Sequence, residues 1–172
     1  MNLQSSDFSL FGLPQQFAQD RRSIDARWKE LQREAHPDKF AAQGAAAQRI
    51  AMQWSVRINE AYQRLKDPLK RAAYLCELSG SAINAHSNTA MPTEFLMQQI
   101  LWREAMEEAR SVADLEILTQ ELNGARSHLL QECEQILDVQ HNPAQAVAPV
   151  RALMFLDKFS QDLNQRFEAL ES

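Results

Sequence analysis

The sequence predicts an all-α protein, and three observations support this fold class. Strong helix formers (Ala, Leu, Gln, Glu, Arg, Met and Lys) occupy 100 of the 172 positions. Val, Ile and Thr together number 15, and the chain has four glycines, too few for the strands and turns of a β fold. Apolar residues recur every three or four positions along most of the chain, as they do on one face of a helix.

Two helices are expected before a proline-containing loop. A short apolar segment, FSLFGLP from Phe8 to Pro14, should form a brief helix that ends at Gly12. Asp20 can cap the next helix, which should end near residues 36–37 because the residue before a proline is pushed out of the α region. The apolar stripe of this second helix is Ile24, Trp28, Leu31 and Ala35.

Two more helices are expected before residue 80. After a loop through Gly44, one face of a long helix carries Ala51, Trp54, Ile58, Ala61, Tyr62 and Leu65. Asp67 and Pro68 should end this helix and start a short one over residues 69–79, with the aspartate as cap and the proline at the first helical position.

Residues 80–92 (GSAINAHSNTAMP) are polar, small and without periodicity, which is typical of a linker. We therefore divide the chain into a first domain of residues 1–80, a linker of residues 81–92 and a second domain of residues 93–172.

The second domain predicts three helices, which short connections would fold into an antiparallel bundle. The first covers residues 93–110, the second follows a cap at Ser111, and the third begins near Asn142 and Pro143. Pro149 should either kink the third helix or delay its start. The stripe of the second helix is Leu115, Leu118, Leu122, Ala125, Leu129, Cys133 and Ile136, and that of the third is Leu153, Leu156, Leu163, Phe167 and Leu170.

Several function classes lack support in the sequence. Cys76 and Cys133 are far apart with no histidine pair nearby, so we expect reduced thiols, no metal site and no cofactor. His86, His128 and His141 are isolated, and no catalytic motif is present, so we do not expect an enzyme. We see neither a membrane span nor a secretory signal, and we therefore expect a cytoplasmic protein that does not bind membranes.

Charge is unevenly distributed, which suggests a different partner for each domain. Residues 1–80 carry 12 basic and 9 acidic groups, whereas residues 81–172 carry 6 and 14. The excess in the first domain is too small, and its basic stripe too poor in aromatic residues, to favour nucleic acid. The acidic second domain would suit a basic partner surface, although charge runs are usually solvated faces.

The tripeptide His36-Pro37-Asp38 lies between the two longest helices of the first domain. Asp38 could merely cap the following helix, and Pro37 could merely stop the preceding one. However, the preceding helix carries Arg22, Lys29 and Arg33 within about 40° of one another, opposite its apolar stripe. Such a stripe leading to an exposed loop would suit an acidic partner surface, and the alternative is a solvated face.

The helix over residues 93–110 has two apolar faces. Phe95, Trp102, Met106 and Ala109 form one face, and the opposite face carries Met97, Ile100, Leu101, Glu104 and Glu108, with Leu96 at its flank. A helix in a bundle needs one core face, so the second group should lie on the surface and mark a partner. The alternative is a wide core face near the linker.

Phe155, in the third helix of the second domain, lies about 200° around that helix from Leu153 and should face away from the main stripe. The alternative is a half-buried residue that packs against the bundle.

The first domain resembles a J domain, through its order of helices and its HPD loop. The full chain resembles one branch of J proteins, the HscB family, in FSLFGLP, HPDKF, INEAYQRLKDPLKRAAYL, FLMQQILWREAMEE and FLDKF. The resemblance implies a co-chaperone that stimulates the ATPase of a dedicated DnaK-class chaperone of the HscA type. The residues that would bind the chaperone are His36, Pro37, Asp38, Arg22, Lys29 and Arg33.

The same resemblance implies a second partner, the iron–sulfur cluster scaffold protein IscU. The residues at the matching scaffold-binding positions are Leu96, Met97, Ile100, Glu104, Glu108 and Phe155. Leu101 stands where close relatives would carry an acidic residue, so its part in the contact is open. A general J-domain adaptor that binds other clients is the alternative function, weakened by the lack of Gly/Phe-rich and zinc-binding regions, and an inert helical structural protein is a third.

Overall fold

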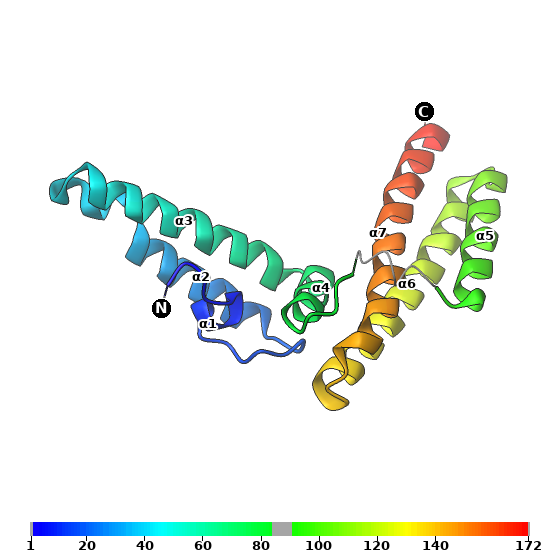
Figure 1. The fold of residues 1–172 in the computed structure, drawn as a ribbon. Helices are drawn as coiled ribbons and strands as arrows, with labels where there is room; N and C mark the ends of the chain where they lie inside the picture. Colours follow the sequence, from blue (N-terminus) through cyan, green and yellow to red (C-terminus); the bar gives the residue numbers. More distant parts are fainter. Residues whose placement is uncertain (1, 84–90, 172) are drawn as a thin grey trace. The chain divides into compact units, whose positions relative to one another are not determined.

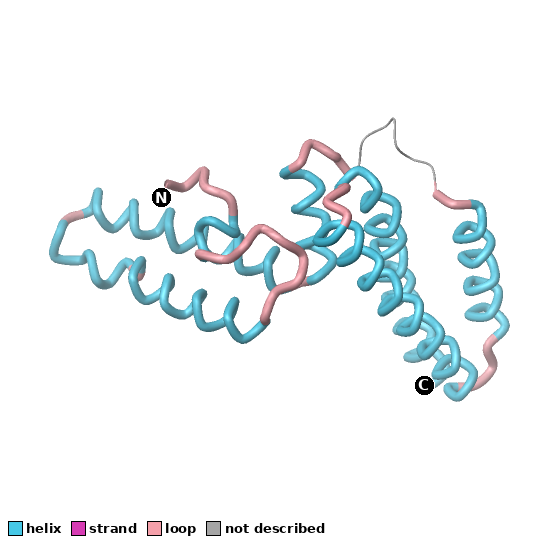
Figure 2. Tube along the Cα trace, turned by 90° about the horizontal axis from the view of Figure 1, so that it is seen from below, coloured by secondary structure: helices cyan, strands magenta, loops and turns pink. Residues whose placement is uncertain are grey.

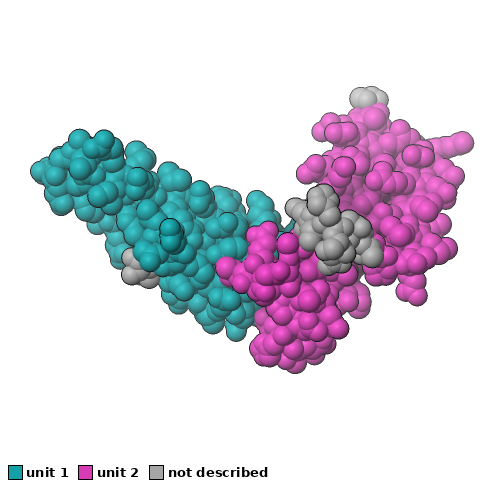
Figure 3. All heavy atoms as spheres, viewed as in Figure 1, with its two compact units in different colours: residues 1–75 teal, residues 76–172 magenta. Residues whose placement is uncertain are grey.

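A computed structural model describes residues 2–83 and 91–171 of the chain. Within these residues every regular element is a helix (Figures 1 and 2), so the predicted all-α class is confirmed. The chain divides into two compact units, Met1–Leu75 and Cys76–Ser172 (Figure 3). Residues 84–90 of the predicted linker lie outside the described residues, and the domain ranges derived from the sequence stay a prediction.

The first unit is built on an antiparallel pair of helices, α2 and α3, that pack along each other (Figure 1). A 3₁₀ segment, η1, occupies the connection that was expected to be a loop. The bounds are α1 Asp7–Phe11, α2 Arg21–Ala35, η1 Pro37–Gln43, α3 Ala45–Lys66 and α4 Pro68–Leu78, the last of which extends into the second unit.

Local capping explains where these helices begin and end. Asp20 accepts a hydrogen bond from the backbone N–H of Arg22 at 3.0 Å and so caps α2. Gly12 ends α1 with a φ of 65°, a left-handed conformation that glycine adopts without strain. Asp67 accepts from the backbone N–H of Leu69 at 2.9 Å at the start of α4. The predicted helix boundaries of the first unit are therefore confirmed to within a few residues.

The core of the first unit is built from buried residues of α1, α2, α3 and α4. Ile24 and Leu31 of α2 are buried, whereas Trp28 and Ala35 lie half-buried at its edge. The fully buried residues contributed by the other helices include Phe8, Leu10, Phe11, Ile58, Ala61, Leu65 and Ala72.

A buried ion-pair cluster holds α1 against α3. The carboxylate of Asp7 is completely buried; it accepts hydrogen bonds from Arg64 at 2.6 and 2.8 Å and forms an ion pair with Arg57 at 2.8 Å. The backbone N–H of Asp7 donates to the hydroxyl of Tyr74 at 3.0 Å. The contacts with two guanidinium groups offset the cost of burying the Asp7 charge, so the cluster sets the position of the N-terminal helix.

The second unit contains the predicted three-helix bundle of α5 Thr93–Glu108, α6 Val112–Glu134 and α7 Pro143–Glu171, with a π-helical segment η2 Gln135–Val139 after α6. Ser111 caps α6 by accepting from the backbone N–H of Asp114 at 3.2 Å. Pro149 lies inside α7, which begins at Pro143, so of the two alternatives the delayed start does not hold. The core residues of the bundle are Trp102, Ala109, Leu115, Leu118, Leu122, Leu156, Phe159 and Leu163.

Candidate partner-binding sites

The His36-Pro37-Asp38 loop presents its side chains to solvent. α2 ends at Ala35, His36 has extended backbone angles, and Pro37 opens η1, a segment with no buried residue. The side chain of His36 is 57% exposed and that of Asp38 is 93% exposed. The loop therefore offers an imidazole and a carboxylate to an incoming partner.

The imidazole of His36 caps η1, a role that the sequence analysis considered for Asp38. Its Nδ1 accepts from the backbone N–H of Asp38 at 3.2 Å. In a neutral imidazole that accepts at Nδ1, the proton lies on Nε2, which is then a free donor. The Asp38 carboxylate does not form this cap, and it is therefore available to a cation of a partner.

Three exposed cations lie on α2 before this loop. Arg22, Lys29 and Arg33 form no ion pair within 4 Å in the described part of the chain. Arg21 and Arg27, by contrast, are bound to carboxylates one turn further along α2, at N–O distances of 2.9 and 3.0 Å. The predicted basic stripe thus consists of cations of α2 that form no close ion pair, whereas Arg21 and Arg27 do.

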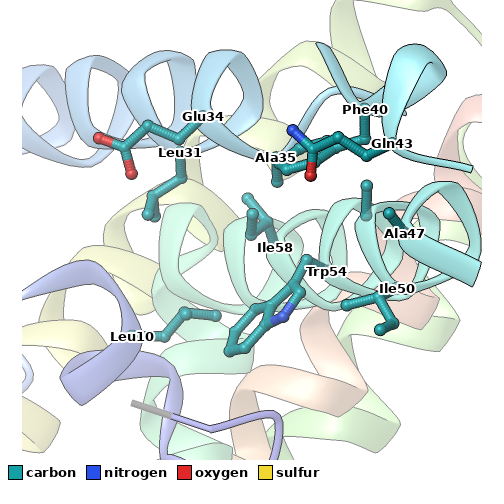
Figure 4. Close-up of a pocket in the computed structure, with 11 residues that line it drawn as sticks. Leu10, Leu31, Glu34, Ala35, Phe40, Gln43, Ala47, Ile50, Trp54 and Ile58 are labelled. Carbon is teal, nitrogen blue, oxygen red and sulfur yellow. The ribbon is translucent and has the colours of Figure 1, made fainter. Parts of the chain in front are cut away.

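An apolar cleft of about 460 Å³ lies between α2, η1 and α3 (Figure 4). Leu31 and Ala35 reach it from α2, Phe40 from η1, and Trp54 and Ile58 from α3 (Figure 4). The η1 segment, which begins at Pro37 of the His-Pro-Asp motif, therefore borders an apolar cleft.

In the second unit, α5 exposes its second apolar face, as predicted. Leu96, Met97, Ile100 and Leu101 are between 44% and 60% exposed. On the opposite face Trp102 and Ala109 are buried in the bundle core, and Phe95 and Met106 pack against that core. Within the bundle, the alternative of one wide core face does not hold. Glu104 and Glu108 are also exposed, and they add acidic groups to this helix.

Phe155 does not face away from the bundle as expected. It is half-buried, edge-on to Phe95 at 5.8 Å and stacked on Phe159 at 5.7 Å, with the Arg103 guanidinium 5.6 Å above its ring. A helical wheel of α7 alone could not predict this packing, because the side of α7 that carries Phe155 is covered by α5. Met154, which the sequence analysis did not single out, is 41% exposed next to it.

Other chemistry has little support in the described residues. They contain no group of three or more His, Cys, Asp or Glu side chains that could hold a metal ion. Cys76 and Cys133 are buried free thiols, and burial raises the pKa of Cys76 to about 11 and that of Cys133 to about 12. No described helix combines the length and apolar character needed to cross a bilayer.

The fold and the loop together define a class of protein. A short helix, an antiparallel hairpin connected through His-Pro-Asp and a closing helix form a J domain, and here a helical bundle follows it. Residues 91–164 match the family model described as the HSCB C-terminal oligomerisation domain.

Known proteins are similar to this chain in sequence or in fold over nearly its full length. The co-chaperone protein HscB homologs of Burkholderia thailandensis and Burkholderia multivorans are 45% and 46% identical, over 99% and 100% of this chain and 99% of each relative. Chaperone HscB from Vibrio cholerae has a TM-score of 0.84 at 32% identity, over 96% of this chain and 99% of that one. Human co-chaperone protein HscB shares the fold, with a TM-score of 0.89 at 22% identity, over 96% of this chain and 84% of that one. The chain belongs to the HscB family, the J-domain co-chaperones of iron–sulfur cluster assembly.

Proposed function

We propose that this co-chaperone stimulates ATP hydrolysis by a dedicated DnaK-class chaperone of the HscA type and delivers an IscU-type scaffold protein to it. The observation that carries the proposal is the exposed His36-Pro37-Asp38 loop at the end of a helix with exposed cations. The same chain carries an exposed apolar helix face in its second unit, which provides a separate place for the scaffold.

The mechanism is a shift in the chaperone's conformational equilibrium rather than chemistry on this chain. A ligand shifts such an equilibrium only through its different affinities for the two states, so the loop must bind the hydrolysing state more tightly. Arg22, Lys29 and Arg33 steer the encounter with an acidic chaperone surface. Asp38 then pairs with a chaperone cation, and the Nε2–H of His36 donates to an acceptor nearby.

The scaffold binds the exposed face of α5. Leu96, Met97 and Ile100 supply apolar area, and Glu104 and Glu108 complement a basic rim on the scaffold. Leu101 extends the apolar area, and Phe155 contributes the exposed part of its ring. Self-association through this face is a second candidate, favoured by the description of the matching family model as an oligomerisation domain. The acidic total of residues 81–172 would oppose pairing of two like faces.

The deciding experiment measures steady-state ATP hydrolysis by the cognate chaperone with scaffold present. The unaltered protein should stimulate hydrolysis, and a folded His36→Gln variant should not. Arg33→Gln should weaken stimulation, whereas Arg27→Gln should leave it nearly unchanged because Arg27 is already paired with Glu30. Absence of stimulation by the unaltered protein would contradict the proposal.

The pairing of Asp38 can be tested by charge exchange. Asp38→Arg should abolish stimulation, and reversing the charge of the partner cation on the chaperone should restore it. If both altered proteins fold but the Asp38→Arg variant does not stimulate the charge-reversed chaperone, Asp38 does not act by pairing with that cation.

Scaffold binding is tested with a triple variant, Leu96→Ala, Met97→Ala and Phe155→Ala, which should lose the complex in calorimetric titration. Because Phe155 is half-buried, the double variant at Leu96 and Met97 is measured as well and should also bind more weakly. Ile117→Ala on α6 is the control, since Ile117 is equally exposed on a helix outside the proposed surface.

One-to-one saturation by the native scaffold distinguishes this function from that of a general adaptor, which would suppress aggregation of many clients. A sedimentation-velocity run of the protein alone tests self-association. A dimer lost in the double variant would assign the face to a second copy.

A further inference from the structure

A ladder of hydrogen bonds crosses from α2 to α3 beside the basic stripe. The indole Nε1–H of Trp28 donates to Oδ1 of Asn59 at 3.0 Å, and Nε2 of Gln32 donates to the same oxygen at 2.7 Å. Oε1 of Gln32 accepts from the hydroxyl of Ser55 at 2.9 Å. Trp28 also stacks on Tyr62, with ring centroids 4.5 Å apart and an interplanar angle of 13°. These contacts hold the two helices in a defined register on their outer side.

The ladder determines which way the amide of Asn59 points. An indole N–H can only donate, so the atom of Asn59 that faces Trp28 must be the oxygen. The NH₂ group of Asn59 is then directed elsewhere, and it has no acceptor among the residues that the structure describes. Asn59 is exposed, so a ligand can approach this residue.

Asn59 also lines a shallow groove that contains two cations. Trp28, Lys29, Gln32, Arg33 and Asn59 line the groove, between α2 and α3. Lys29 and Arg33 are exposed, and neither forms a salt bridge within 4 Å in the described part of the first unit. An ammonium, a guanidinium and an amide NH₂ are all donors, and their combination around one groove suits a carboxylate.

We propose that the groove between α2 and α3 receives a carboxylate-bearing segment of the DnaK-class chaperone, with the NH₂ of Asn59 donating to it beside Lys29 and Arg33. This inference rests on the proposed function and extends the chaperone contact from α2 and the loop onto α3. Two observations favour this occupant: the donors and cations complement an acidic group, and Arg33 lies three residues before His36, about one helical turn from the loop.

The test is Asn59→Asp in the full-length protein. An aspartate keeps an acceptor for Trp28 and Gln32, but it removes the NH₂ donors and places a carboxylate where the ligand's would lie. We expect about a tenfold or greater rise in the Kd for the ATP-bound chaperone, with an unchanged circular dichroism spectrum. Gln53→Glu is the control, because it makes the same change of charge on another face of α3, in a separate groove with Met52.

Binding by Asn59→Asp within about twofold of the unaltered protein would overturn the inference while leaving the proposed function intact. Failure of the unaltered protein to bind the chaperone would overturn both. If the variant does not fold, NMR spectroscopy of the unaltered protein tests the same inference. The indole N–H resonance of Trp28 should shift when the chaperone is added, and that of Trp102 should not; an unshifted Trp28 resonance would exclude an occupied groove.

Discussion

At the scale of single residues, Asp7 is the side chain on which the N-terminal helix most depends. Its buried carboxylate is bound by Arg57 and Arg64, so Asp7→Asn would leave two cations without their shared anion. We expect the free energy of unfolding to fall by about 3 kcal/mol. Urea unfolding followed by circular dichroism measures this. Asp25→Asn, which removes a surface pair with Arg21, should cause a much smaller loss.

The two buried thiols predict how stability responds to alkaline pH. Burial raises the pKa of Cys76 to about 11 and that of Cys133 to about 12, whereas an unfolded thiol ionises near about 8.5. Above that pH the unfolded chain loses protons that the folded chain retains, so stability should fall as pH rises from about 8.5 to about 12. Below about pH 8 these thiols should have no effect on the pH dependence.

The control for the alkaline effect is the double variant Cys76→Ala, Cys133→Ala. It should show a shallower decline of unfolding free energy over the same pH range, because the remaining titrating groups are unchanged. A decline as steep as in the unaltered protein would assign the effect to tyrosine and lysine residues instead.

Residues whose partners lie nearby in the chain could be predicted from the sequence, and those with distant partners could not. Asp20, Asp67 and Ser111 cap helices through backbone groups two or three residues away, so their roles follow from local rules. Asp7 pairs with Arg64, 57 residues away, and no local pattern indicates such a contact. The capping role of His36 was also missed, because an imidazole and a carboxylate can serve the same turn.

At the scale of elements, Gly44 determines how η1 passes into α3. Its φ of 101° and ψ of 170° belong to a region that only glycine occupies without strain. A Cβ at Gly44 would meet no atom within 4 Å, so the cost of Gly44→Ala is purely conformational. We expect a loss of about 1 to 2 kcal/mol in unfolding free energy, measured by thermal and urea unfolding.

Gly124 is the control for Gly44→Ala, because an alanine at position 124 should change stability in the opposite direction. It lies within α6 and is exposed, and a Cβ there also meets no atom within 4 Å. Gly124→Ala should therefore raise stability by about 0.5 to 1 kcal/mol through helix propensity. If Gly44→Ala lowers the free energy of unfolding and Gly124→Ala raises it, then backbone geometry, not packing, makes the connection after η1 sensitive to substitution.

Element boundaries were predictable where a cap or a proline acts locally, but relations between helices were not. The two faces of α5 follow from its own periodicity, and the exposure of Leu96 and Met97 agrees with that prediction. The environment of Phe155 depends on α5 packing against α7, so a helical wheel of α7 alone placed it wrongly. Pro149 was ambiguous because a proline can be tolerated within a helix, as it is here.

At the scale of the whole molecule, the uneven charge of the chain fits two partners rather than one. The loop and cations of the first unit suit an acidic surface, whereas the acidic second unit suits a basic one. Under the proposed function, covalent connection of the two units keeps a scaffold bound to α5 on the same molecule as the loop that binds the chaperone. The second binding event is then intramolecular, with an effective concentration of about millimolar for a short linker.

This connection predicts that two defective variants cannot help each other. His36→Gln should bind scaffold but fail to stimulate the chaperone, and the Leu96→Ala, Met97→Ala double variant should do the reverse. Mixed at micromolar concentration, they should not restore the extra ATP hydrolysis that scaffold causes with the unaltered protein, because neither chain holds both partners. Scaffold-dependent hydrolysis is measured for each variant, for the mixture and for the unaltered protein at equal total concentration. Full activity in the mixture would show that the two units act independently and that delivery on one chain is not how the protein works.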